Sequence, residues 1–306
     1  MILSASRRTD IPAHYMPWLL NRLREGYALV RNPMNPRRVS HIPLTKDVLD
    51  AAVFWTKNPL PMLPHLDALR DLPFYIQFTL TPYGRDIEPN LPEKTALIDS
   101  FVQLSHLLGA HRMVWRYDPI LLNAQWTQDV HLSAFSSMAK RLSGCTDTCV
   151  TSFLDRYRCM ETPCAPLRLR SPSSEEMQEL FFRLSAIADD HGMRLCTCCE
   201  DIPGAPHSSC IDKARLERIT GCALALSPDK NQRPACGCFA SIDIGAYNTC
   251  ANGCLYCYAS HSHASLLKNL AEHDPFSPLL VGHLRPDDIV TPRKAASHKT
   301  QQLTLF

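Results

Sequence analysis

Length, composition and charge exclude several classes of protein. The chain has 306 residues, of which 45% are hydrophobic and 20% are charged, and its formal net charge is +2. This composition excludes a disordered chain, and the small net charge excludes a global basic field for nucleic acid, although not a local basic groove. No stretch approaches the roughly 20 apolar residues that cross a bilayer, and Arg7 and Arg8 precede any apolar signal segment. We therefore expect a cytoplasmic protein that does not associate with membranes.

Short β-rich runs alternate with helical patterns along the chain. The helix expected over 173–192 begins at a capping box, Ser173-x-x-Glu176, and residues 27–44 have the pattern of a small hairpin. Repetition of strand and helix in this order predicts a parallel α/β architecture. The expected strands span 2–10, 52–59, 74–82, 113–119, 149–155 and 193–201, and the expected helices span 12–26, 61–69, 93–108, 127–142 and 173–192.

Polar side chains at the carboxyl ends of these strands indicate where a site lies. Enzymes with α/β barrels build their sites from those ends, so the pattern predicts a partial TIM-like barrel. Residues 1–290 would form this single domain, with a cysteine-rich part at about 194–260, and residues 291–306 a basic polar tail. Basic side chains there can hold phosphate or carboxylate, and Arg–Asp pairing around the barrel mouth is the alternative. The candidate catalytic residues are Arg8, Lys57, Arg116 and Asp118, with Arg7 and Asp10 at the same edge.

The cysteines carry the strongest chemical signal. All 14 lie between Cys145 and Cys257, which is not the distribution of a small disulfide-stapled secreted scaffold. Cys250-x3-Cys254-x2-Cys257 places three thiolates on one tight loop, where each can bind one iron of a [4Fe-4S] cluster. The fourth iron is then open, as in a catalytic metal site. A zinc site is the alternative, but zinc prefers four closed ligands in two pairs, and the spacing of Cys250 and Cys254 does not fit a zinc knuckle.

This cysteine triplet resembles the signature of radical S-adenosylmethionine enzymes. The resemblance implies that the open iron binds S-adenosylmethionine and that one electron cleaves it to methionine and a 5′-deoxyadenosyl radical. It also places Tyr256 near the adenine and implies a reductant of the flavodoxin or ferredoxin type. The run Cys-x-x-Gly-Cys-x-Tyr-Cys-Tyr-Ala at 250–259 is similar to the loop of enzymes related to spore photoproduct lyase, which implies a substrate related to nucleic acid.

The position of this loop near the carboxyl end is unusual for that superfamily. The expected strand 239–245 and the expected helix 264–271 nevertheless frame it as a strand–loop–helix unit. We expect the carboxyl-terminal unit to complete the barrel and to supply the cluster loop, as in a circular permutation.

Five runs resemble a family of bacterial proteins, the domain of unknown function 1848. The resemblance extends over nearly the whole chain and implies a cysteine cluster of the radical-enzyme type at the carboxyl end, without implying a reaction. The runs that carry it are 4–12, 54–59, 77–84, 115–119 and 236–259.

The remaining cysteines fall into two sets. By the same resemblance, Cys198, Cys210, Cys236 and Cys238 would bind a second iron–sulfur cluster or a zinc ion; burial as small hydrophobic residues is the alternative. Substitutes within this set are Cys196, Cys199 and Cys222, and a second set of four, for which we favour a packing role, is Cys145, Cys149, Cys159 and Cys164.

Two other functions are consistent with the sequence. The terminal run Gln302 to Phe306 is similar to the peptide by which bacterial proteins dock on the DNA sliding clamp, so the chain could be an adaptor bound to the clamp. Alternatively, the chain is a non-radical barrel protein with zinc or a structural iron–sulfur cluster that binds or hydrolyses a phosphorylated ligand.

Overall fold

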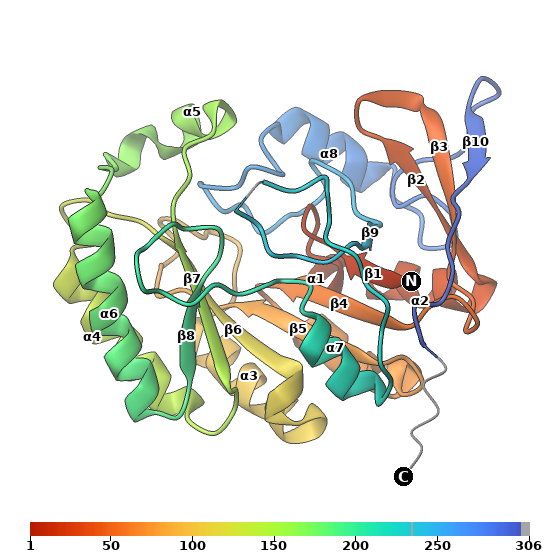
Figure 1. The fold of residues 1–306 in the computed structure, drawn as a ribbon. Coiled ribbons are helices and arrows are strands. Elements are labelled where there is room, and N and C mark those ends of the chain that lie inside the picture. The colour runs from red at the N-terminus through yellow and green to blue at the C-terminus, as the bar shows by residue number, and fades with distance from the viewer. Residues whose placement is uncertain (234, 301–306) are drawn as a thin grey trace, which may run out of the picture.

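The protein has an α/β fold built on a seven-stranded parallel sheet (Figure 1). The computed structural model describes residues 1–233 and 235–300. The sheet strands are β1 (Ile2–Ala5), β4 (Ala51–Thr56), β5 (Phe74–Thr79), β6 (Met113–Ile120), β7 (Thr148–Phe153), β8 (Arg194–Thr197) and β9 (Ile242–Asp243). The α-helices are α1 (Ile11–His14), α2 (Met16–Glu25), α3 (Lys94–Leu108), α4 (Gln128–Leu142), α5 (Glu161–Cys164), α6 (Ser174–Asp190), α7 (Lys213–Thr220) and α8 (His263–Ala271). A ten-residue 3-10 helix is η1 (Leu60–Leu69), and shorter ones are η2 (Ala110–Arg112), η3 (Arg158–Met160) and η4 (Ala165–Leu167).

The strand order places the end of the chain beside its beginning. From one edge the order is β8-β7-β6-β5-β4-β1-β9, so six strands follow one another in sequence and the late strand β9 joins the free side of β1. The pairing is parallel and joins Leu3 to Ile242 and Ser4 to Asp243. Within the described residues β8 and β9 are the two edges of the sheet, and no closed barrel forms. The predicted α/β class is confirmed, and the strand–loop–helix unit expected near the carboxyl end exists as β9, a loop and α8.

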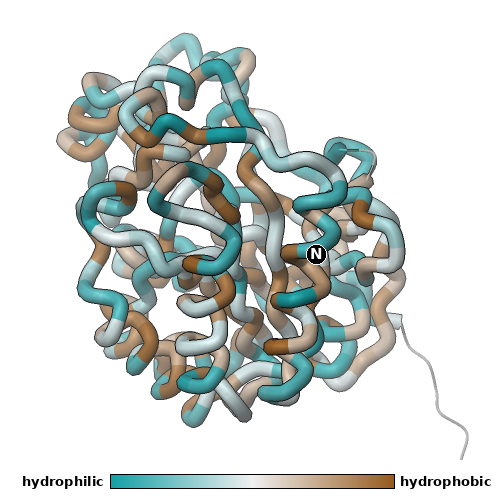
Figure 2. Tube along the Cα trace, turned by 90° about the vertical axis from the view of Figure 1, so that its left-hand side faces the viewer, coloured by the Kyte–Doolittle hydropathy of each residue, from teal (hydrophilic) through white to brown (hydrophobic). Residues whose placement is uncertain are grey.

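The two faces of the sheet are covered differently. Alternate strand residues such as Leu3, Phe54 and Trp115 pack with the helices α2, α3, α4 and α6 in the larger buried core. Residues of opposite orientation, such as Ile2 and Val53, pack in a second core with the cysteine-rich chain and α7. Figure 1 shows this chain crossing the sheet on the side of α7, and Figure 2 shows hydrophobic stretches running through the inside of the molecule. The cysteine-rich part therefore fills the face that would be the interior of a barrel.

A smaller sheet joins the expected hairpin to the chain end. β2 (Tyr27–Asn32) and β3 (Asn35–Pro43) are antiparallel, as predicted, and β10 (Ile289–Pro292) pairs parallel to β3. The following residues of the expected tail are bound to the body: the carbonyl of Ala296 accepts from the Met1 ammonium at 2.7 Å, and Thr300 N–H donates to the carbonyl of Ala223 at 3.0 Å. The clamp-like run at 302–306 lies outside the described residues.

Two of the expected helices differ in detail. The segment expected as an α-helix over 61–69 is the 3-10 helix η1, because Pro64 inside it has no N–H for an α-helical hydrogen bond. The helix expected over 12–26 is divided at Tyr15 into α1 and α2, and it ends as expected at Gly26, whose φ is +77°. The capping box of Ser173 and Glu176 at the start of α6 is confirmed.

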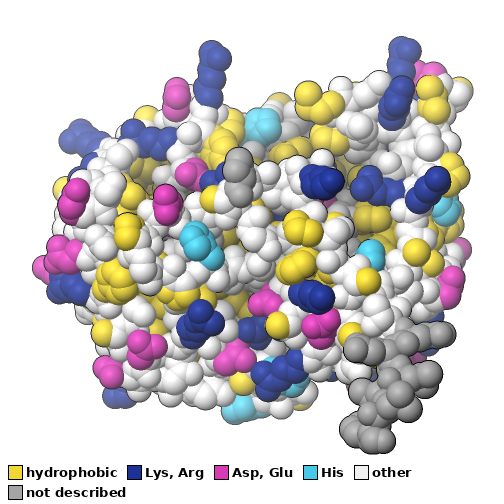
Figure 3. Space-filling view, in the orientation of Figure 1, with side chains coloured by type: hydrophobic (Ala, Val, Ile, Leu, Met, Phe, Trp, Pro, Cys, Tyr) yellow, Lys and Arg dark blue, Asp and Glu magenta, His cyan; other side chains and the backbone are white. Residues whose placement is uncertain are grey.

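The surface agrees with the nearly neutral net charge. In Figure 3 acidic and basic side chains are interspersed over the face shown. No helix in the described part of the chain has the length and apolar character needed to cross a membrane.

Candidate functional site

The cysteine loop, residues 249–259, lies where the strands of the sheet end. It follows β9, whose parallel pairing with β1 brings it to the carboxyl-terminal edge. The body holds its backbone at several points: Tyr15 O–H donates to the carbonyl of Thr249 at 2.6 Å, and Leu255 N–H donates to that of Ile87 at 3.0 Å. Asn248 N–H closes the loop on the carbonyl of Ala259 at 2.7 Å. The loop is therefore fixed on the rim and not free in solvent.

Gly253 is required by the close approach of the loop to the segment before α3. Its φ is +72°, and a Cβ there would lie 2.8 Å from Asn90 Nδ2 and 3.1 Å from Pro89 Cγ. The same Asn90 amide donates to the carbonyl of Ala251 at 2.8 Å. A side chain at this position would push the loop off its support.

The three loop thiols share one partly buried environment. Burial raises the pKa of Cys250, to about 12, with further contributions from Asp10 and the Cys257 thiol. Burial also raises the pKa of Cys254, which the nearby Lys57 ammonium opposes. A metal binds thiolates and releases these protons. The three thiols, a cation beside one of them and a fixed backbone fit an iron–sulfur cluster, which takes each thiolate on a different iron.

Ligands of a single metal ion would converge on one point. Among residues 1–233 and 235–300, no three His, Cys, Asp or Glu side chains have that arrangement.

A buried carboxylate lies behind the loop. The side chain of Glu88 has 0% exposure, and it accepts from Lys57 Nζ at 2.8 Å, from Thr81 Oγ1 at 2.9 Å and from Lys94 Nζ. Burial opposes its charge, but Lys57 and Lys94 outweigh burial and lower the pKa of Glu88 to about 2. Glu88 is thus an ionised centre between two cations.

Tyr256 connects this centre to the loop. Its side chain is 7% exposed, and its hydroxyl is bonded both to Glu88 and to Lys57 Nζ, the latter at 2.8 Å. The ring packs edge-on against Tyr83, with centroids 6.0 Å apart. Tyr256 therefore anchors the loop to the body, and its contact with an adenine stays a prediction.

Two aspartates bind the loop to the first strand unit. Asp10 accepts from the backbone N–H of Lys57 at 2.7 Å and from Asn252 Nδ2 at 2.9 Å. Asp243 accepts from Ser4 Oγ at 2.7 Å and pairs with Arg8 at 3.0 Å. Asp243, like Glu88, was not among the sequence candidates. The sequence signal for it is its place near the carboxyl end of the expected strand 239–245, the criterion by which the other candidates were chosen.

All four predicted catalytic side chains lie at the expected edge, and all are in ion pairs. Arg8 pairs with Asp243 and Lys57 with Glu88, both beside the cysteine loop. Arg116 pairs with Asp118, which also accepts from Ser152 Oγ. The structure thus shows pairing around the rim at each of these positions, the alternative that the sequence left open. Lys57 also contacts the loop, through the Tyr256 hydroxyl.

The second predicted set of cysteines comes together on the inner face of the sheet. Cys198 Sγ and Cys210 Sγ are 3.6 Å apart, Cys210 N–H donates to Cys238 Sγ at 3.2 Å, and Arg116 Nη1 donates to Cys210 Sγ at 3.0 Å. Burial lowers the pKa of Arg7, but the Cys210 and Cys238 thiols, the Asp243 carboxylate and the Cys236 thiol together raise it. We call these residues the inner thiol group: Cys198, Cys199, Cys210, Cys236 and Cys238, where Cys199 lies close enough to Cys198 and Cys236 for their thiols to affect its pKa.

The other set of four is divided between two places. Cys145 and Cys149 are buried in the core against the helices. Cys159 and Cys164 instead lie against the cysteine loop: Cys164 Sγ donates to the carbonyl of Leu255 at 3.4 Å, and the charge of Cys159 affects the pKa of Cys257. All 14 cysteines of the chain are free thiols.

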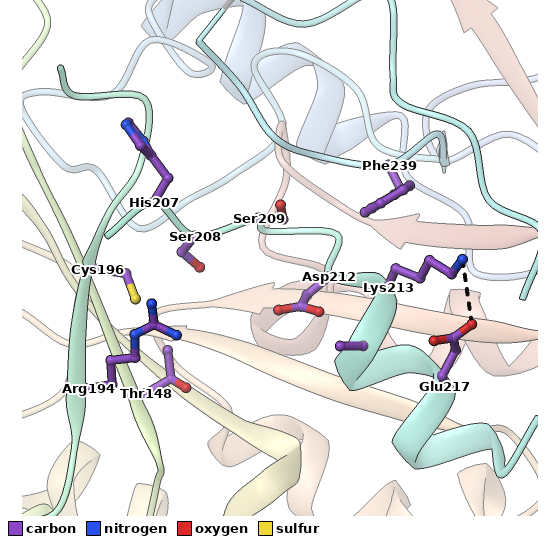
Figure 4. A pocket seen from close by; sticks show the side chains of 11 residues that line it. Thr148, Arg194, Cys196, His207, Ser208, Ser209, Asp212, Lys213, Glu217 and Phe239 are labelled. Atoms are coloured by element: carbon purple, nitrogen blue, oxygen red, sulfur yellow. Dashed lines mark ion pairs between the residues drawn. The ribbon is translucent and has the colours of Figure 1, made fainter. Parts of the chain in front are cut away.

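A cavity of about 380 Å³ lies elsewhere on the inner face, between β8, the 207–209 segment and α7 (Figure 4). Arg194 and Cys196 border it from β8, and Asp212 and Lys213 border it at the start of α7. It includes neither the loop cysteines nor any predicted catalytic residue, so it is separate from the rim site.

Comparison with known proteins identifies one family that the chain matches. The family model described as a domain of unknown function (DUF1848) matches residues 2–259, which include the whole cysteine loop. No curated protein and no solved structure matches the chain.

Proposed function

The chain belongs to the DUF1848 family, and we propose that it is a radical S-adenosylmethionine enzyme with a [4Fe-4S] cluster on Cys250, Cys254 and Cys257. The observation that carries this proposal is the set of three thiols on one fixed loop at the carboxyl-terminal edge of a parallel sheet, where such folds build their sites. The bound cluster and S-adenosylmethionine would supply one-electron cleavage of the sulfonium group to methionine and a 5′-deoxyadenosyl radical. In this proposal the open sheet is a partial barrel completed by β9.

The chain's own residues would hold the loop and balance its charge. Lys57 carries a positive charge beside Cys254 and is itself fixed by Glu88 and Tyr256. Three thiolates on a cluster are negatively charged, so a nearby ammonium stabilises them. Arg8, fixed by Asp243 on the other side of the loop, is the candidate for binding a carboxylate or phosphate of substrate or cofactor.

A segment after β7 covers the cysteine loop. The rings of Tyr157 and Tyr258 are 5.8 Å apart, and Met160 is buried together with Tyr256. The cover is partial, since Tyr157 and Tyr258 are each 44% exposed, and it reduces the access of water to the loop, which favours control of a radical. Arg156 and Arg168 line a cavity of about 280 Å³ in the same segment. Their charge suits a phosphate-bearing substrate, in line with a reaction on a nucleic-acid component.

The second candidate is a non-radical cluster in which all four irons have protein ligands, and the position of Cys159 favours it. This thiol lies close enough to Cys257 to affect its pKa, and its Sγ is 4.0 Å from the carbonyl of Tyr258. If Cys159 bound the fourth iron, no position would be open and the site would be structural.

Electron paramagnetic resonance of the reduced cluster separates the two candidates. We would reconstitute the wild-type chain, Cys159→Ser and the control Cys164→Ser anaerobically, reduce them with dithionite and record spectra with and without S-adenosylmethionine. The proposed function predicts that S-adenosylmethionine changes the spectrum of all three and that their iron contents agree. A closed cluster predicts no change in the wild-type spectrum and a lower iron content in Cys159→Ser alone.

We propose two partners, the first required by the reaction and the second implied by the resemblance of residues 302–306 to the clamp-binding peptide. The reduction needs a one-electron donor of the flavodoxin or ferredoxin type, and the run at 302–306 would bind the DNA sliding clamp. A pull-down with purified clamp tests the second partner: the full chain should be retained, and a chain without residues 302–306 should not. Equal retention of both chains, or retention of neither, would rule out the clamp peptide.

A further inference from the structure

We propose that Cys198, Cys210, Cys236 and Cys238 bind a second metal centre, a zinc ion or an iron–sulfur cluster, and that Arg7 and Arg116 offset its negative charge. This proposal does not depend on the reaction proposed for the cysteine loop. The centre would lie on the inner face of the sheet, within the chain that fills it.

The four cysteines come from separate segments that fold onto one place. Cys198 follows β8, Cys210 precedes α7, and Cys236 and Cys238 lie on the segment that leads to β9. Cys210 is central: its Sγ is 3.6 Å from Cys198 Sγ, and its backbone N–H donates to Cys238 Sγ at 3.2 Å. Backbone N–H groups that donate to sulfur orient metal-binding thiolates in this way.

The alternative, that these cysteines only pack as small apolar residues, leaves the positively charged side chains beside them unexplained. Arg116 has a side chain only 7% exposed, and its Nη1 donates to Cys210 Sγ at 3.0 Å. A buried guanidinium is costly unless an anion accepts from it, and a neutral thiol is a weak acceptor. Asp118 accepts on the other side of Arg116. On the side that faces Cys210, Nη1 also donates to the neutral Gln77 Oε1 at 3.4 Å, and a thiolate at Cys210 would supply a negatively charged acceptor there.

Arg7 supplies an independent observation. Its Nη2 is buried and has no hydrogen-bond partner among the described residues. Its guanidinium lies over the Trp55 ring, 5.1 Å from the centroid. The Cys210 and Cys238 thiols, the Asp243 carboxylate and the Cys236 thiol favour its charge. Four thiolates around Zn²⁺, or around a cluster core of the same charge, carry about −2 in total. Such a centre would give the buried Nη2 its acceptor.

Arg7 also lies between the two cysteine sites. Its carbonyl accepts at 2.9 Å from the hydroxyl of Tyr258, the residue after Cys257, and its charge is favoured by thiols of the inner thiol group. The spacing of Cys198 and Cys210 is close to the ~3.8 Å expected for two sulfurs on one tetrahedral zinc with bonds of ~2.3 Å. Because no three described thiols converge on one point, Cys236 and Cys238 would turn toward the other two on binding.

The test removes the loop cysteines first. We would purify the full chain with Cys250→Ala, Cys254→Ala and Cys257→Ala anaerobically, supply either zinc or ferrous iron with sulfide, and measure zinc, iron and labile sulfide per chain. We expect one centre per chain: about one zinc in the first arm, or equal iron and sulfide in the second. Adding Cys198→Ser and Cys210→Ser should remove it, and adding the control Cys222→Ser should not.

A second variant keeps the proposal falsifiable if the serine variant does not fold. Arg7→Met in the same background should weaken metal binding about tenfold or more in competition with a chelator, whereas Arg141→Met, which breaks a surface pair with Asp99, should leave it unchanged. The proposal is wrong if the folded triple-alanine chain binds neither metal, if metal stays after Cys198→Ser and Cys210→Ser, or if peptide mapping of the anaerobic protein finds a Cys198–Cys210 disulfide. Because the loop ligands are absent, none of these outcomes depends on the radical reaction.

Discussion

Replacing Glu88 by Gln removes one buried negative charge and leaves two cations facing each other. The Lys57 and Lys94 side chains are only 15% and 25% exposed, so solvent compensates them poorly. Removing one partner of a buried ion pair costs about 3–5 kcal/mol. The depression of the Glu88 pKa from 4.5 to about 2 gives a similar figure, about 3 kcal/mol at roughly 1.4 kcal/mol per pH unit. We expect Glu88→Gln to lower the free energy of unfolding by about 3 kcal/mol at pH 7.

The pH dependence identifies the cause of this loss. A carboxyl group whose pKa is lower in the folded state stabilises the fold above its unfolded pKa and loses that contribution as the pH falls toward its folded pKa. The difference between wild type and Glu88→Gln should therefore be constant at neutral pH and shrink between pH 4.5 and about 2.

Urea denaturation followed by circular dichroism at a series of pH values measures this difference. The control is Glu93→Gln, which breaks a surface pair with Arg85 in which both side chains are at least 70% exposed and should cost under about 1 kcal/mol. A difference for Glu88→Gln that is as small as the control's, or that is the same at pH 7 and pH 3, would refute the reasoning.

Two further predictions concern the support of the cysteine loop. Gly253→Ala should lower the iron content after reconstitution, because the new Cβ would meet Asn90 and Pro89. The control is Gly221→Ala, whose φ is similar at +66° and whose Cβ would meet nothing within 4 Å, so it should only cost about 1 kcal/mol of stability. Equal iron contents in the two variants would contradict this prediction. Asp243→Asn should accelerate amide hydrogen exchange in residues 244–259, because Arg8 and Ser4 lose the negative charge that holds β9 to β1. Mass spectrometry measures the exchange. Unchanged exchange in these residues, or equal acceleration in β7, would show that Asp243 does not hold the loop.

Local patterns in the sequence predicted the strand–helix units well. Short β-rich runs predicted the strands, and the capping box at Ser173 and the stop at Gly26 predicted helix ends that the structure confirms. The exceptions are η1, which was expected as an α-helix but contains Pro64, and the helix expected over 12–26, which is divided at Tyr15. The placement of the late unit beside β1 could also be expected, because the cysteine loop has to meet the polar strand ends.

The contacts that support the site could not be predicted in the same way. Glu88 and Tyr256 are hydrogen-bonded but lie 168 residues apart in the sequence, and Asp243 and Arg8 are hydrogen-bonded but lie 235 residues apart. No short motif predicts such pairs, because in its local sequence each charged residue looks like an ordinary surface charge. The neighbours of the inner thiol group, Arg7 and Arg116, are likewise brought there only by the way the cysteine-rich chain covers the sheet.

Formation of 5′-deoxyadenosine tests the central claim most directly. The chain, reconstituted anaerobically with iron and sulfide, would be incubated with S-adenosylmethionine and dithionite, and the products would be measured by liquid chromatography and mass spectrometry. We predict 5′-deoxyadenosine and methionine from the wild type and from Cys222→Ser, and neither from Cys254→Ala. A wild-type chain with its full complement of iron and sulfide that forms no 5′-deoxyadenosine would contradict the account.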